Sequence, residues 1–204
     1  MLTDAQISSF KENGYLFLPD ALGMDQLDRL RAQFEVWIEE SRAHTTPYGE
    51  TMDGRPRFDL EPGHTAEQPA LRRIASPVEI CDVYLEVMRD NRALDAVADI
   101  FGPNIKFENA KINSKQPGAA TQVKFHQDFL FEAHTNDDMI TVLFFLDDVT
   151  PENGPLQVVP GTHTGPLYEH WHAGVFTGAV SDEVADRKST RLNSSHQIIS
   201  YAVF

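Results

Sequence analysis

The spacing of apolar residues predicts helices in the N-terminal half of the chain. Their three- and four-residue intervals over residues 24–40 are typical of one buried helix face: Leu27, Leu30, Phe34 and Trp37 or Ile38. Two further helices are expected over about 78–89 and 92–101. Thr3 and Gln6 have the spacing of a capping box, so a short helix should begin there and end near Gly14.

From Ile105 onward the pattern changes to short stretches that favour strands. They predict strands over residues 105–114, 122–128, 139–146 and 156–160, after an earlier short one at 15–19. Residues 41–69 lack periodicity and are rich in Gly, Pro, Thr and charge, which indicates a long loop. Helices followed by antiparallel strands predict an α+β or mainly β chain. The expected architecture is a double-stranded β-helix (jelly roll, cupin-like) with N-terminal helices packed outside it.

Composition narrows the partners that we expect. The 204 residues fit one domain and carry a formal charge of -14, which argues against a nucleic-acid partner. Cys81 is the only cysteine, so no disulfide framework is possible and a reducing compartment is favoured. We see no signal peptide and no run long enough to span a membrane. A cytoplasmic protein without a membrane partner is expected, and its oligomeric state is unknown from the sequence.

The last residues, 186–204, have an unusual origin in our interpretation. Asp186–His196 and Ile199–Phe204 resemble the translation of a common sequencing-library adapter, with Gln197-Ile198 in the place of its index. We therefore expect a native domain of residues 1–185, truncated before its last strands, and a non-native tail. The alternative is a genuine loop followed by a short apolar strand. A truncated barrel should not close, and the tail could pair opportunistically as a strand.

His126 and Asp128 are the strongest candidates for chemistry. Side chains two positions apart on an extended segment lie on the same face. A histidine and a carboxylate are two of the three ligands that hold non-haem Fe(II) in the two-His-one-carboxylate arrangement. His-x-Asp alone is a weak motif, because a surface histidine beside a turn aspartate gives the same letters.

The surrounding motifs strengthen this interpretation. The segments that carry a family resemblance are Leu2–Pro19, Gly102–Lys115, His126-Gln127-Asp128 and the run from Asn153 to His163. Through them the chain resembles the phytanoyl-CoA dioxygenase family over essentially all of residues 1–185. The resemblance implies an Fe(II)-dependent oxygenase with 2-oxoglutarate and O2 as co-substrates. It also implies that His126 and Asp128 bind the iron. During turnover, 2-oxoglutarate would be decarboxylated to succinate while the substrate is hydroxylated.

The resemblance further implies a distal histidine and a following arginine that we cannot place. The arginine would bind the far carboxylate of 2-oxoglutarate through its planar fork. His196 and Arg191 lie in the adapter-like tail, and Arg191 precedes His196 instead of following it. His170 and His172 could substitute as ligands, but we expect them in a variable segment at the barrel mouth. We therefore expect the chain as it stands to be inactive.

Candidates for binding 2-oxoglutarate come from the strand expected over residues 105–114. Period two places Phe107, Asn109, Lys111 and Asn113 on one face. By the resemblance, Lys111 and Asn113 are candidates; the alternative is a solvated strand face. Gln127 should point away from its neighbours on a regular strand, yet its counterpart lies near the co-substrate in some relatives, so it is a third candidate.

Asp128 also bears on the type of reaction. Related halogenases lack this carboxylate, so its presence favours hydroxylation of a small organic substrate. His163 is expected to fix a loop through hydrogen bonds instead of binding metal. The alternative function is a jelly-roll binding or isomerase-type protein that does not use 2-oxoglutarate, because a fold alone does not determine a function.

Overall fold

A computed structural model describes residues 1–115, 123–131, 134–136, 138–151, 153, 155–188 and 198–203. An antiparallel six-stranded sheet with the order β1-β2-β3-β4-β8-β5 forms its centre. Its strands are β1 (Tyr48–Glu50), β2 (Pro56–Leu60), β3 (Leu71–Ala75), β4 (Asn109–Ser114), β5 (Thr141–Phe145) and β8 (Ile198–Val203). A separate hairpin pairs β6 (Trp171–His172) with β7 (Val175–Phe176).

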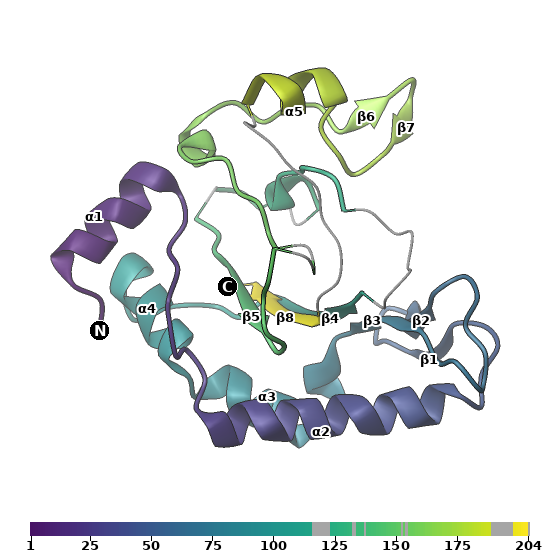
Figure 1. Cartoon of the computed structure of the whole chain (residues 1–204). Coiled ribbons are helices and arrows are strands. Elements are labelled where there is room, and N and C mark those ends of the chain that lie inside the picture. Colours follow the sequence, from purple (N-terminus) through teal and green to yellow (C-terminus); the bar gives the residue numbers. More distant parts are fainter. Residues whose placement is uncertain are drawn as a thin grey trace.

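The helices lie mainly on one side of this sheet. They are α1 (Asp4–Asn13), α2 (Met24–Ser41), α3 (Asp82–Arg89), α4 (Arg92–Phe101) and α5 (Asp182–Lys188), with 3-10 turns η1 (Pro77–Glu79), η2 (Asp128–Leu130) and η3 (Thr162–Thr164). Figure 1 shows α2 and α3 along one side of the sheet, while α5, the β6–β7 hairpin and η2 lie on the opposite side. This division leaves one face of the sheet for the core and the other for a site.

The helix predictions are confirmed with small shifts at the ends. Thr3 accepts a hydrogen bond from the Gln6 N–H, and the Gln6 side chain accepts one from the Thr3 N–H, which completes the expected capping box. Gly14 then ends α1 with a φ of 80°. The helix expected from residue 78 begins at Asp82 because Pro77–Glu79 form the separate turn η1. Cys81 is the N-cap of α3 and packs against the core.

The hydrophobic core lies between the helices and the sheet. The predicted apolar face of α2 is buried through Leu30, Phe34 and Trp37. These residues belong to one cluster with side chains from the strands, including Ile74, Ala110, Ile112 and Phe144. In β4 burial alternates: Ala110, Ile112 and Ser114 are buried, while Asn109, Lys111 and Asn113 are half-buried. The pleat therefore points the latter three away from the helices. Phe107 lies before the strand.

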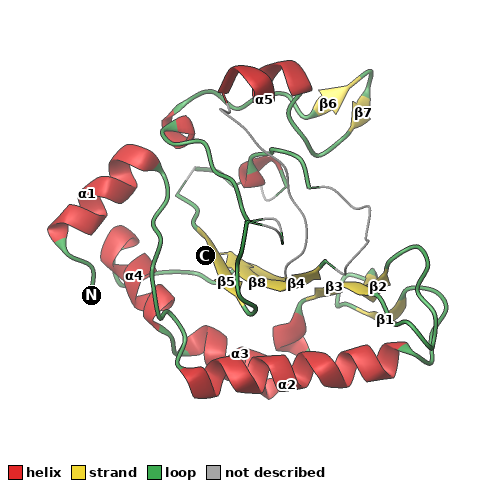
Figure 2. Cartoon of the chain, in the orientation of Figure 1, coloured by secondary structure: helices red, strands yellow, loops and turns green. Residues whose placement is uncertain are grey.

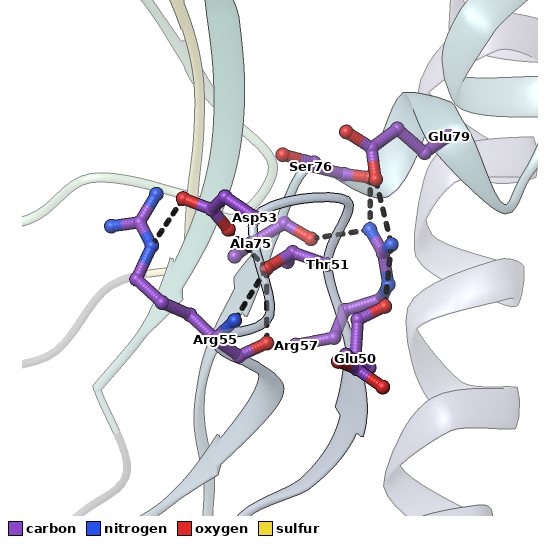
Figure 3. A network of polar contacts seen from close by, with 8 residues as sticks. All are labelled: Glu50, Thr51, Asp53, Arg55, Arg57, Ala75, Ser76 and Glu79. Carbon is purple, nitrogen blue, oxygen red and sulfur yellow. Dashed lines mark hydrogen bonds and ion pairs between the residues drawn. The ribbon is translucent and has the colours of Figure 1, made fainter.

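Residues 41–69 do not form the plain loop that the sequence indicated. They contain the β1–β2 hairpin, which is anchored by the buried side chain of Arg57 (Figure 3). Its guanidinium donates hydrogen bonds to the carbonyls of Glu50, Ala75 and Ser76 and forms an ion pair with Glu79 at 2.6 Å. The prediction failed because hydrophobic periodicity cannot reveal a strand whose interior residue is a paired charge.

Three other expected strands are absent from the described residues. Segments 15–19 and 156–160 are irregular, and residues 123–127 have no regular secondary structure before Asp128 begins η2 (Figure 2). The main sheet runs from β1 to β5 without joining its two ends. The architecture is therefore helices packed on an open antiparallel sheet, and the closed jelly roll of a complete barrel is not seen in these residues.

β8 comes from the part of the chain that resembles an adapter. Pairing of these residues as a strand was expected, but β8 lies inside the sheet, between β4 and β5, and not at an edge. It pairs antiparallel with β4 from Asn109↔Val203 to Ser114↔Ile198 and with β5 from Thr141↔Val203 to Phe145↔Ile199. His196 and Arg191 lie outside the described residues.

Candidate functional site

The side chains of His126 and Asp128 converge on one another beside the first residue of β5. His126 Nε2 lies 3.1 Å from Asp128 Oδ1, and the two side chains are 32% and 29% exposed. Gln127 between them has an extended backbone, with φ -114° and ψ 122°. The expected same-face arrangement is present, although an extended segment and the first residue of η2 provide it in place of a strand.

A backbone hydrogen bond defines which nitrogen of His126 can bind a ligand. Nδ1 lies 2.8 Å from the carbonyl oxygen of Lys124. Because a carbonyl only accepts, Nδ1 must carry the proton, and in the neutral ring the lone pair is on Nε2. Histidines that bind metals commonly donate their other ring N–H to a carbonyl or carboxylate in this way. The nitrogen nearest Asp128 is therefore the one suited to a metal.

Thr141 fixes the other side of the pair. Its hydroxyl donates a hydrogen bond to Asp128 Oδ2 at 2.8 Å. Thr141 is the first residue of β5, so this bond connects the carboxylate to the sheet and leaves Oδ1 toward His126. Sequence analysis missed this residue, because the only signal was its place near the start of a predicted strand.

The charges of the pair support each other in the metal-free protein. The hydrogen bond with Asp128 raises the pKa of His126 despite partial burial of the imidazole. Burial alone would raise the pKa of Asp128, but the hydrogen bonds from His126 and Thr141 and the positive charges of His126 and Lys111 lower it overall. An ion pair is therefore favoured, and a divalent cation would compete with the proton on Nε2.

Lys111 and Asn113 lie on the same face of β4, as the alternation predicted. Lys111 is close enough for its charge to affect the pKa of both His126 and Asp128. Asn113 is paired in register with Arg73 of β3 and is half-buried. The structure thus brings Lys111 to the candidate pair. A role for either residue in binding 2-oxoglutarate remains a prediction.

The side chain of Gln127 is engaged away from the pair. Its Oε1 accepts a hydrogen bond from the Tyr168 N–H at 2.8 Å, and its Nε2 donates to the Pro166 carbonyl at 3.2 Å. Its role toward a co-substrate also remains a prediction. His163 behaves as expected of a loop-fixing residue, since its Nε2 lies 3.0 Å from the Lys11 carbonyl oxygen.

The other two candidate histidines have backbone partners as well. His170 is buried, and both of its ring nitrogens contact backbone groups, the Gln127 N–H and the Tyr168 carbonyl. His172 Nε2 lies 3.0 Å from the Ala179 carbonyl oxygen. Among the described residues no three His, Cys, Asp or Glu side chains are grouped to hold a metal ion, so the site offers two ligands there.

No helix in the described part of the chain is long and apolar enough to cross a membrane.

Comparison with known proteins supports the resemblance. A family model described as phytanoyl-CoA dioxygenase (PhyH) matches residues 10–192. A probable alpha-ketoglutarate-dependent hypophosphite dioxygenase of Stutzerimonas stutzeri is 36% identical over 136 residues, which cover 64% of this chain and 46% of that protein. L-proline trans-4-hydroxylase of Streptomyces griseoviridis is 29% identical over 172 residues, 82% of this chain and 58% of the relative. The chain spans about half the length of the curated relatives that it matches.

Solved structures show the same fold at low sequence identity. EctD from S. alaskensis with bound Fe has a TM-score of 0.70 and 17% identity, over 99% of this chain and 70% of its own. The epimerase SnoN, in complex with Fe3+, alpha ketoglutarate and nogalamycin RO, has a TM-score of 0.64 and 16% identity, over 98% of this chain and 76% of its own. The open sheet and its helices therefore correspond to a large part of that fold.

Proposed function

This chain belongs to the phytanoyl-CoA dioxygenase family, and we propose that it carries part of the active site of an Fe(II)- and 2-oxoglutarate-dependent dioxygenase. The observation that carries the proposal is the pair of His126 Nε2 and Asp128 Oδ1, 3.1 Å apart, with the Nδ1 side of the imidazole held by the Lys124 carbonyl. The proposed reaction is hydroxylation of a small organic molecule. Relatives named for proline and ectoine support a small substrate.

The donor set fits a divalent metal as far as the described residues extend. His126 offers Nε2 once a metal displaces its proton, with Nδ1 held by the Lys124 carbonyl, and Asp128 offers a carboxylate whose lowered pKa keeps it ionised. When bound, iron and 2-oxoglutarate supply the oxidising chemistry, while the protein orients the groups around them. We propose that Lys111, with Asn113 beside it on β4, attracts a carboxylate of 2-oxoglutarate, because an ammonium group beside the pair complements that charge.

Direct coordination can be tested with Zn(II) as a diamagnetic probe. We expect saturable but weak binding at mildly alkaline pH, seen as a large shift of the 15N resonance of His126 Nε2. Asp128→Asn should weaken this binding by at least roughly tenfold, the effect of losing even an outer partner of a metal ligand. His172→Phe is the matched control and should leave the shift unchanged. If the His126 resonance does not respond to Zn(II), the proposed metal site is wrong.

A ternary complex of the protein with Fe(II) and 2-oxoglutarate should form less readily with this chain than with a protein that supplies three metal ligands. Two protein ligands give weak coordination with little selectivity for Fe(II). We expect no visible charge-transfer band when Fe(II) and 2-oxoglutarate are titrated anaerobically at micromolar concentration. A saturable band that disappears in His196→Ala would show that residues 186–204 supply the third ligand. A band lost only in His126→Ala or Asp128→Ala would indicate another third ligand.

A second candidate reaction follows from one structural neighbour. SnoN is an epimerase in complex with Fe3+ and alpha ketoglutarate, so this fold serves more than hydroxylation. The two reactions differ in their products. Hydroxylation adds an oxygen atom from O2 to the substrate, whereas epimerisation leaves its mass unchanged. Mass spectrometry after turnover under 18O2 by an active relative that carries these residues would distinguish them.

A further inference from the structure

Three hydrogen bonds connect Gln127, which lies between His126 and Asp128, to residues 166–170, and a fourth fixes the imidazole of His170 within that segment. The Gln127 N–H donates to His170 Nε2 at 3.0 Å, and the Tyr168 carbonyl accepts from His170 Nδ1 at 2.9 Å. The Gln127 side chain adds the two bonds to the Tyr168 N–H and the Pro166 carbonyl. The three bonds to Gln127 thus hold a residue that lies directly between the two candidate metal ligands.

The partners define the chemical state of His170 without ambiguity. A carbonyl oxygen can only accept, so Nδ1 of His170 carries a proton. The Gln127 N–H can only donate, so Nε2 has a free lone pair. The imidazole is therefore the neutral Nδ1–H tautomer, and it is 1% exposed. To bind a metal through Nε2, it would have to release the Gln127 N–H.

The backbone around Gln127 needs such a partner. Gln127 has an extended backbone, yet residues 123–127 form no strand ladder with the other described residues. The Phe125 carbonyl accepts a hydrogen bond from the Val180 N–H at 2.9 Å, and the N–H of Gln127, two residues further along, finds its acceptor in the imidazole of His170. Without that acceptor the N–H would lose a bond that extended backbone elsewhere obtains from a neighbouring strand.

We propose that His170 is a positioning residue that holds the Gln127 backbone so that His126 and Asp128 face one another. Any rotation about φ or ψ of Gln127 turns one of the two side chains away from the other, because they lie on either side of it. The Gln127 side-chain amide reinforces this arrangement through its bonds to Pro166 and Tyr168. The inference rests on the proposed function, in which the pair binds a metal.

Packing is the competing explanation. The ring of Phe131 contacts His170 with centroids 6.5 Å apart and also contacts His126 at 5.7 Å, both edge to face. An aromatic side chain at position 170 could then support His126 through Phe131 alone. Two substitutions separate these roles. His170→Phe keeps a ring and loses both hydrogen bonds, whereas His170→Gln loses the ring but retains one donor and one acceptor on its amide.

The test uses two readouts on the full chain: hydrogen exchange of the Gln127 amide without metal, and Zn(II) affinity from the 15N resonance of His126. His170→Phe should speed exchange at Gln127 and weaken Zn(II) binding by roughly tenfold or more. His170→Gln should retain most of both properties. His172→Phe, two residues away, should change neither. If His170→Phe fails to fold, Gln127→Ala, which removes only the side-chain bonds, should weaken Zn(II) binding to a smaller extent.

Several results would overturn the positioning role. They are unchanged exchange and affinity in a folded His170→Phe protein, a Gln variant as defective as the Phe variant, a Gln127→Ala protein with undiminished affinity, and a coordination shift at His170 itself. The exchange measurement needs no metal. Absence of Zn(II) binding in the unsubstituted chain would therefore refute the proposed metal site, while exchange at Gln127 would still decide whether His170 holds the backbone.

Discussion

At the scale of single residues, the candidate site depends on a hydroxyl and a backbone carbonyl that hold Asp128 and His126 in place. Asp128 has one carboxylate oxygen toward His126 and the other bound by the Thr141 hydroxyl. His126 is restrained by the Lys124 carbonyl. Each ligand therefore has a fixed orientation before any metal arrives, which lowers the cost of ordering the site on binding.

We predict that Asp128→Asn lowers the pKa of His126 in the metal-free protein. The hydrogen bond and charge of Asp128 raise that pKa, and a neutral amide cannot replace its charge. Titration of the imidazole by NMR measures the change directly, with Asp138→Asn as the control. A His126 pKa that stays the same in Asp128→Asn would mean that the two side chains do not form an ion pair in solution.

The same ion pair sets a pH window for stability. The folded-state pKa of His126 is raised. The stability that His126 adds to the fold is therefore complete below its unfolded pKa and is lost as pH rises through its folded pKa. The folded-state pKa of Asp128 is lowered, so its contribution is lost as pH falls through that value. The difference in unfolding free energy between the unsubstituted chain and Asp128→Asn should therefore be largest at mildly acidic pH and decrease toward alkaline pH.

Sequence reasoning reached only part of this site. His126 and Asp128 could be predicted because a two-residue spacing and an extended backbone determine which side chains share a face. Thr141 could not, and His170 was named only as a possible substitute ligand, since neither lies on the segment that carries the pair. Their contact with the pair depends on how β5 and residues 166–170 pack. Lys111 is intermediate, because alternation along β4 predicted its face but not its distance from the pair.

At the scale of elements, the helices were predictable and the β1–β2 hairpin was not. Apolar periodicity and capping residues specify α1, α2 and α4 locally, without reference to the rest of the chain. The hairpin depends instead on Arg57, whose partners are the Glu50 carbonyl in β1 and the stretch from Ala75, at the end of β3, to Glu79. No local pattern contains that information.

We predict that Arg57→Ala destabilises the protein by roughly 2–4 kcal/mol, because it removes a buried ion pair and leaves backbone carbonyls without a donor. Arg57→Lys should not restore the loss, since one ammonium group cannot reproduce the planar fork. Urea denaturation measures both. Arg55→Ala is the matched control: Arg55 pairs with Asp53 but its side chain is 79% exposed, so the change should be below about 1 kcal/mol. Equal effects of the two alanine substitutions would contradict the anchoring role.

At the scale of the whole molecule, the order of motifs indicated the family and the helix-plus-sheet architecture, but not the arrangement of the sheet. Pairing partners such as β4 and β8 are far apart in sequence, and strand register depends on three-dimensional packing. β8 separates β4 from β5, and in the described residues β5 pairs with no other strand.

That residues 186–204 are foreign to the native fold stays a prediction, and a deletion tests how much β8 contributes to the sheet of this chain. Removing residues 189–204 should leave the facing edges of β4 and β5 unpaired, which promotes association between chains. We expect a lower midpoint of thermal unfolding and higher-mass species in light scattering coupled to size-exclusion chromatography. A monomer with unchanged thermal stability would show that β8 contributes nothing to the sheet.

The position of α2 also has a consequence for how the chain folds. α2 packs on β2, β3 and α3, which are close to it in sequence, but Arg31 also donates a hydrogen bond to the carbonyl of Leu146 at 2.6 Å. Contacts between near neighbours form quickly, whereas closing a loop of more than a hundred residues is slower. The helical layer and first hairpin should therefore assemble early and serve as a template for β5. Because Thr141 of β5 holds Asp128, the candidate metal ligands would reach their final orientation among the last events of folding.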